Sequence, residues 1–353
     1  MDFQVVVLTG STSKNLVPLA SKEVPKALLP VTNRRLISYV LEHLEQNNLK
    51  DLIVVVEGKD AALHVGGWIS GAYVDRLHVE VVAVPEDVGT AGAIRAIAHH
   101  LTAEYILVVS GDLVSDLPPR AVVASHRRHG AAVTAVLCSA PVSGALESGS
   151  GGGKDKIKKP GQCDIIGLHT TKQFLLYIAT GGETDKDNRI QKTIPRTIGS
   201  MEIRSDLMDA HMYAFKRSVL HEPVEIKGFT KIYTTYERKW KPEDHNSKCH
   251  VRLNSIQAFV DINRDVIGDA NHLSGHSFSA HNNIIHPSVE LGSKTTVAPH
   301  HMLGEASQMG DKSSVKRCVI GRHRWLGSNV KVKLFVHKMV VNIFGKVILI
   351  TSV

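Results

Sequence analysis

The sequence is poor in aromatic residues and in cysteine. Phe, Trp and Tyr make up 5% of the 353 residues, and there are four cysteines. Cys138, Cys163, Cys249 and Cys318 are scattered and form neither a paired metal-ligand motif nor a disulfide framework. This usage is typical of a protein of the reducing cytosol. The opening residues, Met-Asp-Phe-Gln, run straight into an apolar stretch, and we expect no secretory signal peptide.

The chain is basic, but it lacks the interleaved aromatic residues that often accompany basic residues in nucleic-acid-binding proteins. The formal net charge is +8 and the pI is about 9.2, which can draw a protein to nucleic acid or to an acidic partner. The basic residues are dispersed, except in segments 154–159 and 312–324, and no aromatic platform is interleaved with them. We therefore expect no direct nucleic-acid contact, and an acidic protein partner or assembly instead.

The first half of the chain alternates short β-branched runs with helical patterns. Helices are predicted over 36–49 and 91–101, where apolar residues recur at helical spacing. Buried strands are predicted at Phe3–Leu8, Asp51–Val56, Val79–Val84, Tyr105–Ser110 and Ala132–Cys138. The alternation predicts a Rossmann-like α/β domain with a mostly parallel sheet, covered on both faces, that binds ligands at the carboxyl ends of its strands.

This α/β domain is expected to span residues 1–222. Its pattern is broken at 141–162, where Ser-Gly-Ser-Gly-Gly-Gly and a lysine-rich run predict a flexible, solvent-exposed loop. Short strands are predicted after it at 165–168, 174–179 and 207–215, and a helix from Lys216. The irregular region 223–280 is interpreted as a linker.

The second half carries an internal repeat with a period of six residues. The apolar members are Ile285, Leu291, Val297, Leu303, Met309 and Val315 and, after a one-residue slip, Ile320, Leu326 and Val332. Glycine directly follows most of them, and small residues such as Thr295, Ser307 and Ser313 come four places later. The pattern predicts a left-handed parallel β-helix over 281–332 whose apolar residues point inward. A run of antiparallel strands would give a period of two instead.

The last stretch, 333–353, abandons the repeat and is strongly apolar. A membrane span needs about 18 or more uninterrupted apolar residues, but His337, Lys338, Asn342 and Lys346 interrupt this run. We expect a strand-like cover over the open end of the β-helix, because an uncovered end would favour aggregation.

Several motifs in the first half occur in an order that resembles the sugar-nucleotide pyrophosphorylases. They are the loop 8–16, Pro25-Lys-Ala-Leu-Leu-Pro30, Gly89-Thr90-Ala91-Gly92 opening a helix, Ser110-Gly111-Asp112 ending a strand, and the strand Asp209–Phe215. The resemblance implies that the loop and Lys26 handle phosphates, that Gly89 and Thr90 belong to the base-recognising segment, and that Asp112 is a metal ligand.

The phosphate loop departs from that pattern. It keeps Gly10, but Ser11 and Ser13 stand where the family has glycines, and Asn15 stands where it has an arginine. His211 replaces a glycine near the sugar pocket. Losing one donor to transition-state charge costs about 2.7–4 kcal/mol, so we expect no catalytic residues here. Lys26 and Asp112 are then either relic ligands or an ordinary surface lysine and turn carboxylate.

Taken whole, the sequence resembles the gamma-subunit family of eukaryotic translation initiation factor 2B, in its plant form. The segments that carry this resemblance are 1–7, 54–57, 66–69, 201–206, 252–259 and 261–268. The resemblance implies a non-catalytic regulatory or scaffolding subunit of a cytosolic complex that exchanges GDP for GTP on initiation factor 2. It implies an epsilon-type subunit and other subunits as partners, no membrane, and no required cofactor, with vestigial nucleotide or Mg²⁺ binding left open.

The chain departs from that family in two places, and parts of the sequence are compatible with two other functions. Segments 223–249 and 333–353 replace longer family segments, which suggests a truncated or alternatively spliced copy. An active sugar-phosphate nucleotidyltransferase is the second hypothesis, and the loop at 10–15 distinguishes it from the first. A β-helix acyltransferase using His300 and His301 is the third, although histidines there are usually solvent-facing turn residues.

Overall fold

The computed structural model of the protein describes two compact units. One comprises Met1–Val5, Ala98–Val108 and Pro118–Lys241, and the other Val6–Ile97, Val109–Leu117 and Pro242–Val353. Within them the described residues are 3–10, 16, 19–20, 24–139, 165–171, 174–179, 200–221, 233–238, 250–267, 271–273, 283–297, 302–320 and 322–337. The predicted loop 141–162 therefore lies outside the described residues.

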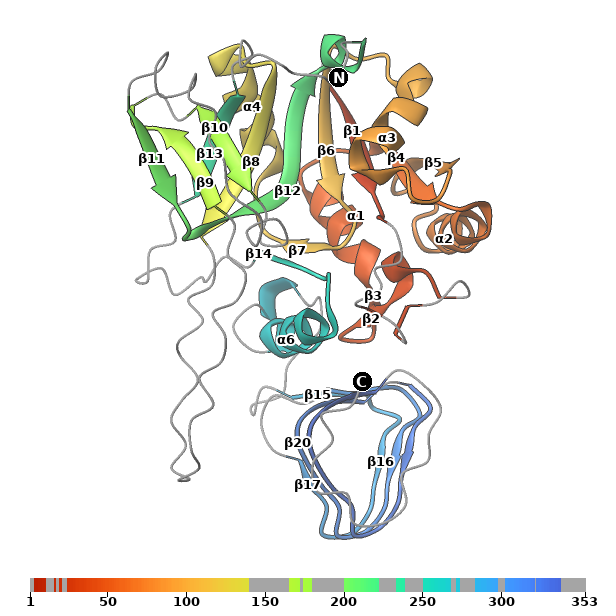
Figure 1. The fold of residues 1–353 in the computed structure, drawn as a ribbon. Coiled ribbons are helices and arrows are strands. Elements are labelled where there is room, and N and C mark those ends of the chain that lie inside the picture. The colour runs from red at the N-terminus through yellow and green to blue at the C-terminus, as the bar shows by residue number, and fades with distance from the viewer. Residues whose placement is uncertain are drawn as a thin grey trace. The chain divides into compact units, whose positions relative to one another are not determined.

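The main sheet has seven strands in the order β13-β8-β12-β6-β1-β4-β5. In chain order they are β1 (Phe3–Leu8), β4 (Asp51–Glu57), β5 (His78–Val84), β6 (Tyr105–Ser110), β8 (Val133–Ser139), β12 (Leu207–Lys216) and β13 (Tyr233–Arg238). β4 pairs in parallel with β5, and β8 pairs in parallel with β13 and antiparallel to β12. The predicted Rossmann-like α/β class is confirmed (Figure 1).

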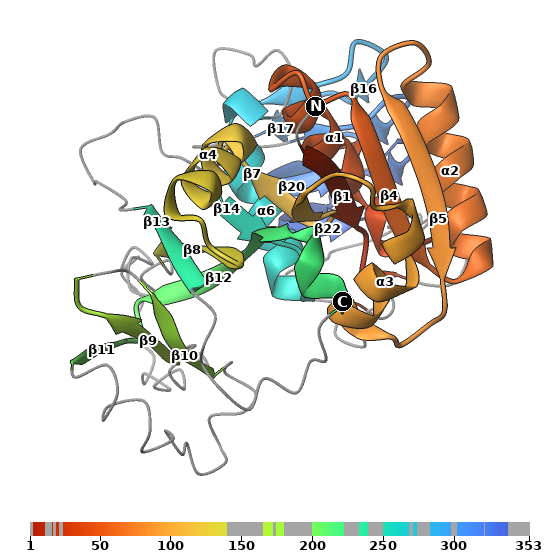
Figure 2. The same cartoon turned by 90° about the horizontal axis from the view of Figure 1, so that it is seen from above.

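Helices accompany these strands, and two of them lie outside the ranges that were predicted to be helical. α2 (Lys59–Ala72) packs on β4 and β5, and α4 (Pro119–His129) packs on β8, β12 and β13 (Figure 2). The predicted helix 36–49 is α1 (Leu36–Gln46), which ends sooner because Asn48 adopts a left-handed φ of 56°. The predicted helix 91–101 is divided into α3 (Gly89–Ala96) and η3 (Ala98–His100).

One predicted buried strand is not buried. β5 exposes His78, Glu80 and Ala83, while only Val84 is fully buried. The reason is its place at the edge of the sheet, where it has a single strand neighbour and half of its side chains face outward. The apolar content of the run therefore overstated its burial.

A small antiparallel sheet lies in the same unit as β8 and β12. Its strands are β9 (Ile165–His169), β10 (Leu175–Ala179) and β11 (Met201–Arg204), in the order β10-β9-β11. Ile166 and Leu168 of β9 pack against Leu137 and Leu207, which joins this sheet to the ends of β8 and β12. The helix expected from Lys216 is the short η4 (Arg217–His221).

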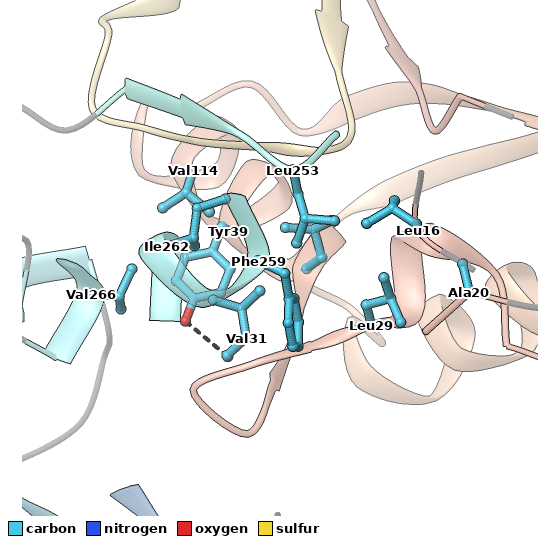
Figure 3. Close-up of a cluster of buried hydrophobic side chains, with 11 residues drawn as sticks. Leu16, Ala20, Leu29, Val31, Tyr39, Val114, Leu253, Phe259, Ile262 and Val266 are labelled. Atoms are coloured by element: carbon cyan, nitrogen blue, oxygen red, sulfur yellow. Dashed lines mark hydrogen bonds between the residues drawn. The ribbon is translucent and has the colours of Figure 1, made fainter. Parts of the chain in front are cut away.

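The range 223–280, interpreted as a linker, contains β13, β14, α6 and a short helix, η5. β14 (His250–Arg252) pairs antiparallel with β7 (Leu113–Ser115), and α6 (Ile256–Ile267) follows it. α6 packs into a buried cluster with residues of the β2 (Pro30–Val31) and β3 (Arg34–Arg35) hairpin and of α1 (Figure 3). The other short helices are η2 (Lys26–Leu28) and η5 (Asn271–Leu273).

The repeat region forms stacked parallel strands, seen nearly end-on in Figure 1. Ile284 pairs with Met302, and Met302 pairs in turn with Val319. The partners of the second pair are one residue closer in sequence than those of the first. The one-residue slip in the sequence is therefore a shortened turn of the stack. The strands are β15 (Ile284–Ile285), β16 (Glu290–Leu291), β17 (Thr296–Val297), β18 (Met302–Leu303), β19 (Gln308–Met309), β20 (Ser314–Ile320), β21 (Trp325–Leu326) and β22 (Lys331–His337).

Most of the repeat residues point inward. Leu303, Met309, Val315, Ile320 and Leu326 are buried together, with Val297 packed against them. The first two members are exceptions, because Ile285 is 40% and Leu291 is 47% exposed. Among the described strands each of them has a neighbour on one side only, as expected at the end of a stack.

The end of the repeat differs from the prediction. β22 stays in parallel register with β20 as far as His337, so the ladder continues past residue 332. Residues 338–353 lie outside the described residues, and the predicted cover stays a prediction. Among the residues that the structure describes, no helix is long and apolar enough to cross a membrane.

Candidate functional site

The carboxyl end of β1 leads into the predicted phosphate loop. Thr9 is buried and fixes this point, since its N–H and its hydroxyl both donate to the Val55 carbonyl at 3.0 Å. Gly10 follows with a φ of +70°, a conformation that favours glycine. Ser11, Ser13 and Asn15 lie outside the described residues, so the prediction that they disable the loop still rests on sequence.

Gly111 brings a second strand end against the first. Its N–H donates to the Leu8 carbonyl at 2.7 Å. A Cβ at this position would lie 3.2 Å from Thr9 Cα and 3.3 Å from the Leu8 oxygen, so a larger residue would push β6 away from β1. The close approach places the next residue, Asp112, beside the start of the loop.

Asp112 and Lys26, which the resemblance assigns to a metal ion and to phosphates, are in direct contact with each other. The Lys26 ammonium donates to Asp112 Oδ2, although 86 residues separate the two in sequence. Lys26 is 5% and Asp112 1% exposed, so neither is the surface residue of the alternative interpretation. Ser110 donates to Asp112 Oδ1 at 2.6 Å.

A third charged residue completes the cluster, and sequence reasoning did not single it out. Arg252 Nε lies 2.9 Å from Asp112 Oδ2 and 3.2 Å from Oδ1. The Leu253 N–H also donates to the Asp112 backbone carbonyl at 3.0 Å. The only sequence signal was the motif that begins at Arg252, and no spacing rule connects it with Asp112.

The electrostatics of the cluster keep the Asp112 carboxylate charged. Burial by itself would raise the pKa of Asp112, but Lys26 and Arg252 outweigh that effect and hold the pKa below its ordinary value. Burial lowers the pKa of Lys26, while Asp112 acts in the opposite direction. The three groups thus form a buried ion cluster in which the carboxylate is the shared anion.

Gly89 and Thr90 lie on a different element from this cluster. Gly89 begins α3 with a φ of +66°, and a side chain at residue 89 would meet open space, so the backbone conformation is what requires glycine. Thr90 is exposed in the first turn of α3. Nearby, Glu57 Oε2 is buried without a hydrogen-bond partner in the described part of the chain, and burial raises the pKa of Glu57.

His211 occupies a backbone conformation that suits glycine. Its φ is +50°, at an irregularity in the β12–β8 pairing. Asp209 holds it there, because its Oδ1 accepts from the His211 N–H at 2.8 Å while its Oδ2 accepts from the Tyr213 hydroxyl. This geometry agrees with the expectation that His211 replaces a glycine. A non-glycine residue at such an angle is strained.

The residues around Asp112 do not suit a divalent metal ion. Mg²⁺ binds carboxylate oxygens and keeps several of its waters, which requires free oxygens and space. Both Asp112 oxygens already contact cationic or hydroxyl donors, and the residue is almost fully buried. In the described ranges, no three His, Cys, Asp or Glu side chains are grouped to hold a metal.

Comparison with known proteins shows which families and folds the α/β region resembles. A family model described as nucleotidyl transferase matches residues 4–149. A crystal structure of HddC from Yersinia pseudotuberculosis is similar, with a TM-score of 0.51 and 13% identity over 74% of this chain and 98% of that one. At this identity the similarity shows the fold alone.

Three curated relatives align with more of the chain, and each is a translation initiation factor eIF2B subunit gamma. The Dictyostelium discoideum protein is 24% identical over 91% of this chain and 88% of its own length. The Schizosaccharomyces pombe protein is 25% identical over 66% of this chain and 49% of its own. The Caenorhabditis elegans protein is 23% identical over 74% of this chain and 65% of its own.

Proposed function

We propose that this chain, which belongs to the family of eIF2B gamma subunits, works as a non-catalytic regulatory or scaffolding subunit of the guanine-nucleotide exchange factor eIF2B in translation initiation. The observation that carries the proposal is the alignment with the Dictyostelium discoideum subunit over 91% of this chain, because it spans both the α/β region and the repeat region. The match to the nucleotidyl transferase family model, over residues 4–149, covers only the first of these.

The Asp112 cluster supports the non-catalytic part of the proposal. Pyrophosphorylase chemistry needs cationic groups and a metal directed at the phosphates. In this chain Lys26 donates to Asp112 Oδ2, and Arg252 Nε lies 2.9 Å from the same oxygen. We expect no required cofactor and at most vestigial nucleotide binding around Gly10, Gly89 and Thr90.

The partners we propose are an epsilon-type subunit, further eIF2B subunits and initiation factor 2, in the cytosol. The resemblance implies that the epsilon subunit carries the exchange-catalysing domain, so this chain would contribute contact surface. The stacked parallel strands are proposed to be a left-handed β-helix. Support comes from the pairing of β15, β16 and β17 with β18, β19 and β20, because a strand that pairs with the third strand after it suits three short strands per turn.

Affinity capture tests this proposal. Tagged chain, incubated in a plant extract, should retain an epsilon-type subunit identified by mass spectrometry. The purified chain alone should not accelerate GDP release from initiation factor 2. Capture of no eIF2B subunit, or exchange by the isolated chain, would contradict the proposal.

An active nucleotidyltransferase is the second candidate, favoured by the family match over 4–149. It predicts pyrophosphate release from a nucleoside triphosphate and a sugar 1-phosphate, abolished by Asp112→Ala. We expect no release from any pair tested, because the loop departs at Ser11, Ser13 and Asn15. The acyltransferase hypothesis rested on His300 and His301, which lie outside the described residues.

A further inference from the structure

The segment 250–267 is bound to the strand end that carries Asp112 through its backbone as well as its side chains. β14 pairs with β7, with Val251 opposite Val114 and Arg252 opposite Leu113. The Leu253 N–H then donates to the Asp112 carbonyl at 3.0 Å. Arg252 therefore lies on a strand that pairs with β7, and the residue after it is hydrogen-bonded to the Asp112 backbone. It does not belong to a free surface loop.

The helix that follows fixes this segment in the core. Leu253 is fully buried, and Phe259, Ile262 and Val266 of α6 pack with it in one cluster (Figure 3). The cluster also contains Leu16, Leu29, Val31, Leu36, Tyr39 and Val114. Moving the backbone of Arg252 away from Asp112 would require this apolar contact to open, at roughly 25 cal/mol per Å² of apolar surface exposed.

A polar contact anchors α6 at a second point, on the hairpin next to the Lys26 segment. Thr32 and Asn33 both have left-handed backbone angles, with φ of 45° and 59°. The Thr32 N–H donates to Asn263 Oδ1 at 2.8 Å, and Asn263 Nδ2 donates to the Phe259 carbonyl at 2.8 Å. Both groups are buried, so the hairpin turn depends on α6 for its hydrogen bond.

A divalent cation would have to displace the side chains that contact the Asp112 carboxylate. It would need an oxygen at about 2.0–2.6 Å, but Oδ2 already contacts Lys26 and lies 2.9 Å from Arg252 Nε. Oδ1 is shared by Ser110 and Arg252. Entry would also place the ion beside two cationic side chains in a site with little solvent, where repulsion is weakly screened.

We propose that Arg252, held by β14 and α6, is a built-in substitute for a metal ion at Asp112, so that this carboxylate excludes divalent cations and metal-bound phosphate. Attachment of the 250–267 segment and cation binding at Asp112 are then mutually exclusive. The consequence is a nucleotidyltransferase-like site whose Asp112 carboxylate stays paired with side chains of the same chain. This inference concerns the chain alone and does not depend on its assembly into an exchange complex.

Manganese binding tests the proposal, because Mn²⁺ substitutes for Mg²⁺ and is paramagnetic. Free and bound Mn²⁺ are measured by electron paramagnetic resonance with the full chain and with Arg252→Gln. The wild-type chain and the Asp112→Asn variant should bind the same amount of Mn²⁺, because Asp112 binds none in the wild-type chain. Arg252→Gln should gain one site, and the Arg252→Gln/Asp112→Asn double variant should lose it. Arg76→Gln is the matched control, since Arg76 pairs with Glu45 on the surface, and it should gain none.

A second measurement covers the case in which Arg252→Gln does not fold. Mn²⁺ broadens methyl resonances close to it, so the methyl groups of Leu113, Val114 and Leu253 report on Asp112 in the unchanged chain. These resonances should stay sharp in millimolar Mn²⁺. Selective broadening of them in the wild-type chain would overturn the proposal, as would a folded Arg252→Gln variant that gains no Asp112-dependent site.

Discussion

Single residues in this chain take their roles from their neighbours more than from their chemical type. Asp112 has the position of a metal ligand at the end of β6, yet Lys26 and Arg252 make it the anion of a buried ion cluster. Removing one member of such a cluster costs more than the cluster contributes, because the remaining charges stay buried without compensation.

Asp112→Asn should therefore lower the free energy of unfolding by about 3–5 kcal/mol. The variant leaves Lys26 and Arg252 facing a neutral amide. Asp206→Asn is the matched control: Asp206 is exposed and pairs with Arg204, so its loss should cost about 0–1 kcal/mol. Urea denaturation followed by circular dichroism measures both. Equal losses in the two variants would mean that the Asp112 cluster is not buried as described.

His126 predicts acid sensitivity. Its ring is fully buried, with Nδ1 2.8 Å from Thr134 Oγ1 and Tyr105 packed edge-on at 5.6 Å. Burial, with Lys216 and Arg127 nearby, lowers the pKa of His126 from 6.5 to about 4. Above pH 6.5 the imidazole is neutral in both states. Below it the unfolded chain takes up the proton first, so stability should fall by about 3 kcal/mol as pH drops to 4.

The variant His126→Gln should remove this part of the pH dependence while lowering stability at pH 7.5. His129→Gln, at an exposed site on the same helix, is the control and should keep the slope. Urea midpoints between pH 7.5 and 4.5 give the comparison. An unchanged slope in His126→Gln would show that this imidazole is not the group that titrates.

At the scale of elements, the stacked strands depend on which turn of the stack a residue occupies. Leu291 and Leu303 hold the same position in the six-residue repeat, but Leu291 is 47% exposed and Leu303 is 1% exposed. Gly292 and Gly310 show how tightly the turns stack, because a Cβ on either would lie 2.7 Å or less from backbone atoms of the next turn. The turns of the stack therefore have no room for a side chain at these two glycines.

Leu303→Asp should unfold the repeat region, at a cost above about 4 kcal/mol, because it buries an unpaired charge. Leu291→Asp introduces the same side chain at the exposed end and should cost less than about 1 kcal/mol. Thermal unfolding of both variants beside the unchanged chain decides the matter. If Leu303→Asp melts at the wild-type temperature, the inward register of the repeat is wrong.

The periodicity of the sequence was enough to predict the elements that depend on a local pattern. β1 and β6 have their predicted bounds, and the slip between Val315 and Ile320 appears as a strand pairing that is shortened by a single residue. These features could be read from the sequence because each turn of a stack or each buried strand repeats a short-range rule.

Contacts between distant segments could not be read in this way. Arg252 lies 140 residues from Asp112, and Asn263 lies 231 residues from Thr32. α6 fell in a region interpreted as a linker, although it buries Phe259 in the core. No periodic pattern marks a residue that matters through one distant partner, so Arg252 was missed while Lys26 and Asp112 were found by motif.

At the scale of the whole molecule, the proposed function depends on association with other subunits. The chain combines an α/β region whose candidate site is occupied by its own side chains with a stack of strands that offers an extended surface. Stable subunit interfaces bury about 1,200–2,000 Å² or more, which is more than one small element provides. We therefore expect both the α/β region and the stacked strands to contribute to binding.

Co-expression with an epsilon-type subunit should give a complex that elutes as one peak in size-exclusion chromatography. Leu303→Asp, which disrupts the stacked strands, should weaken the complex at least tenfold, because the surface that they offer depends on their fold. Asp75→Asn, at a turn after α2, is a surface control and should bind as the unchanged chain does.

The GDP release rate of initiation factor 2 should not rise with the chain alone. Failure of the unchanged chain to co-elute with the epsilon-type subunit would contradict the proposed role.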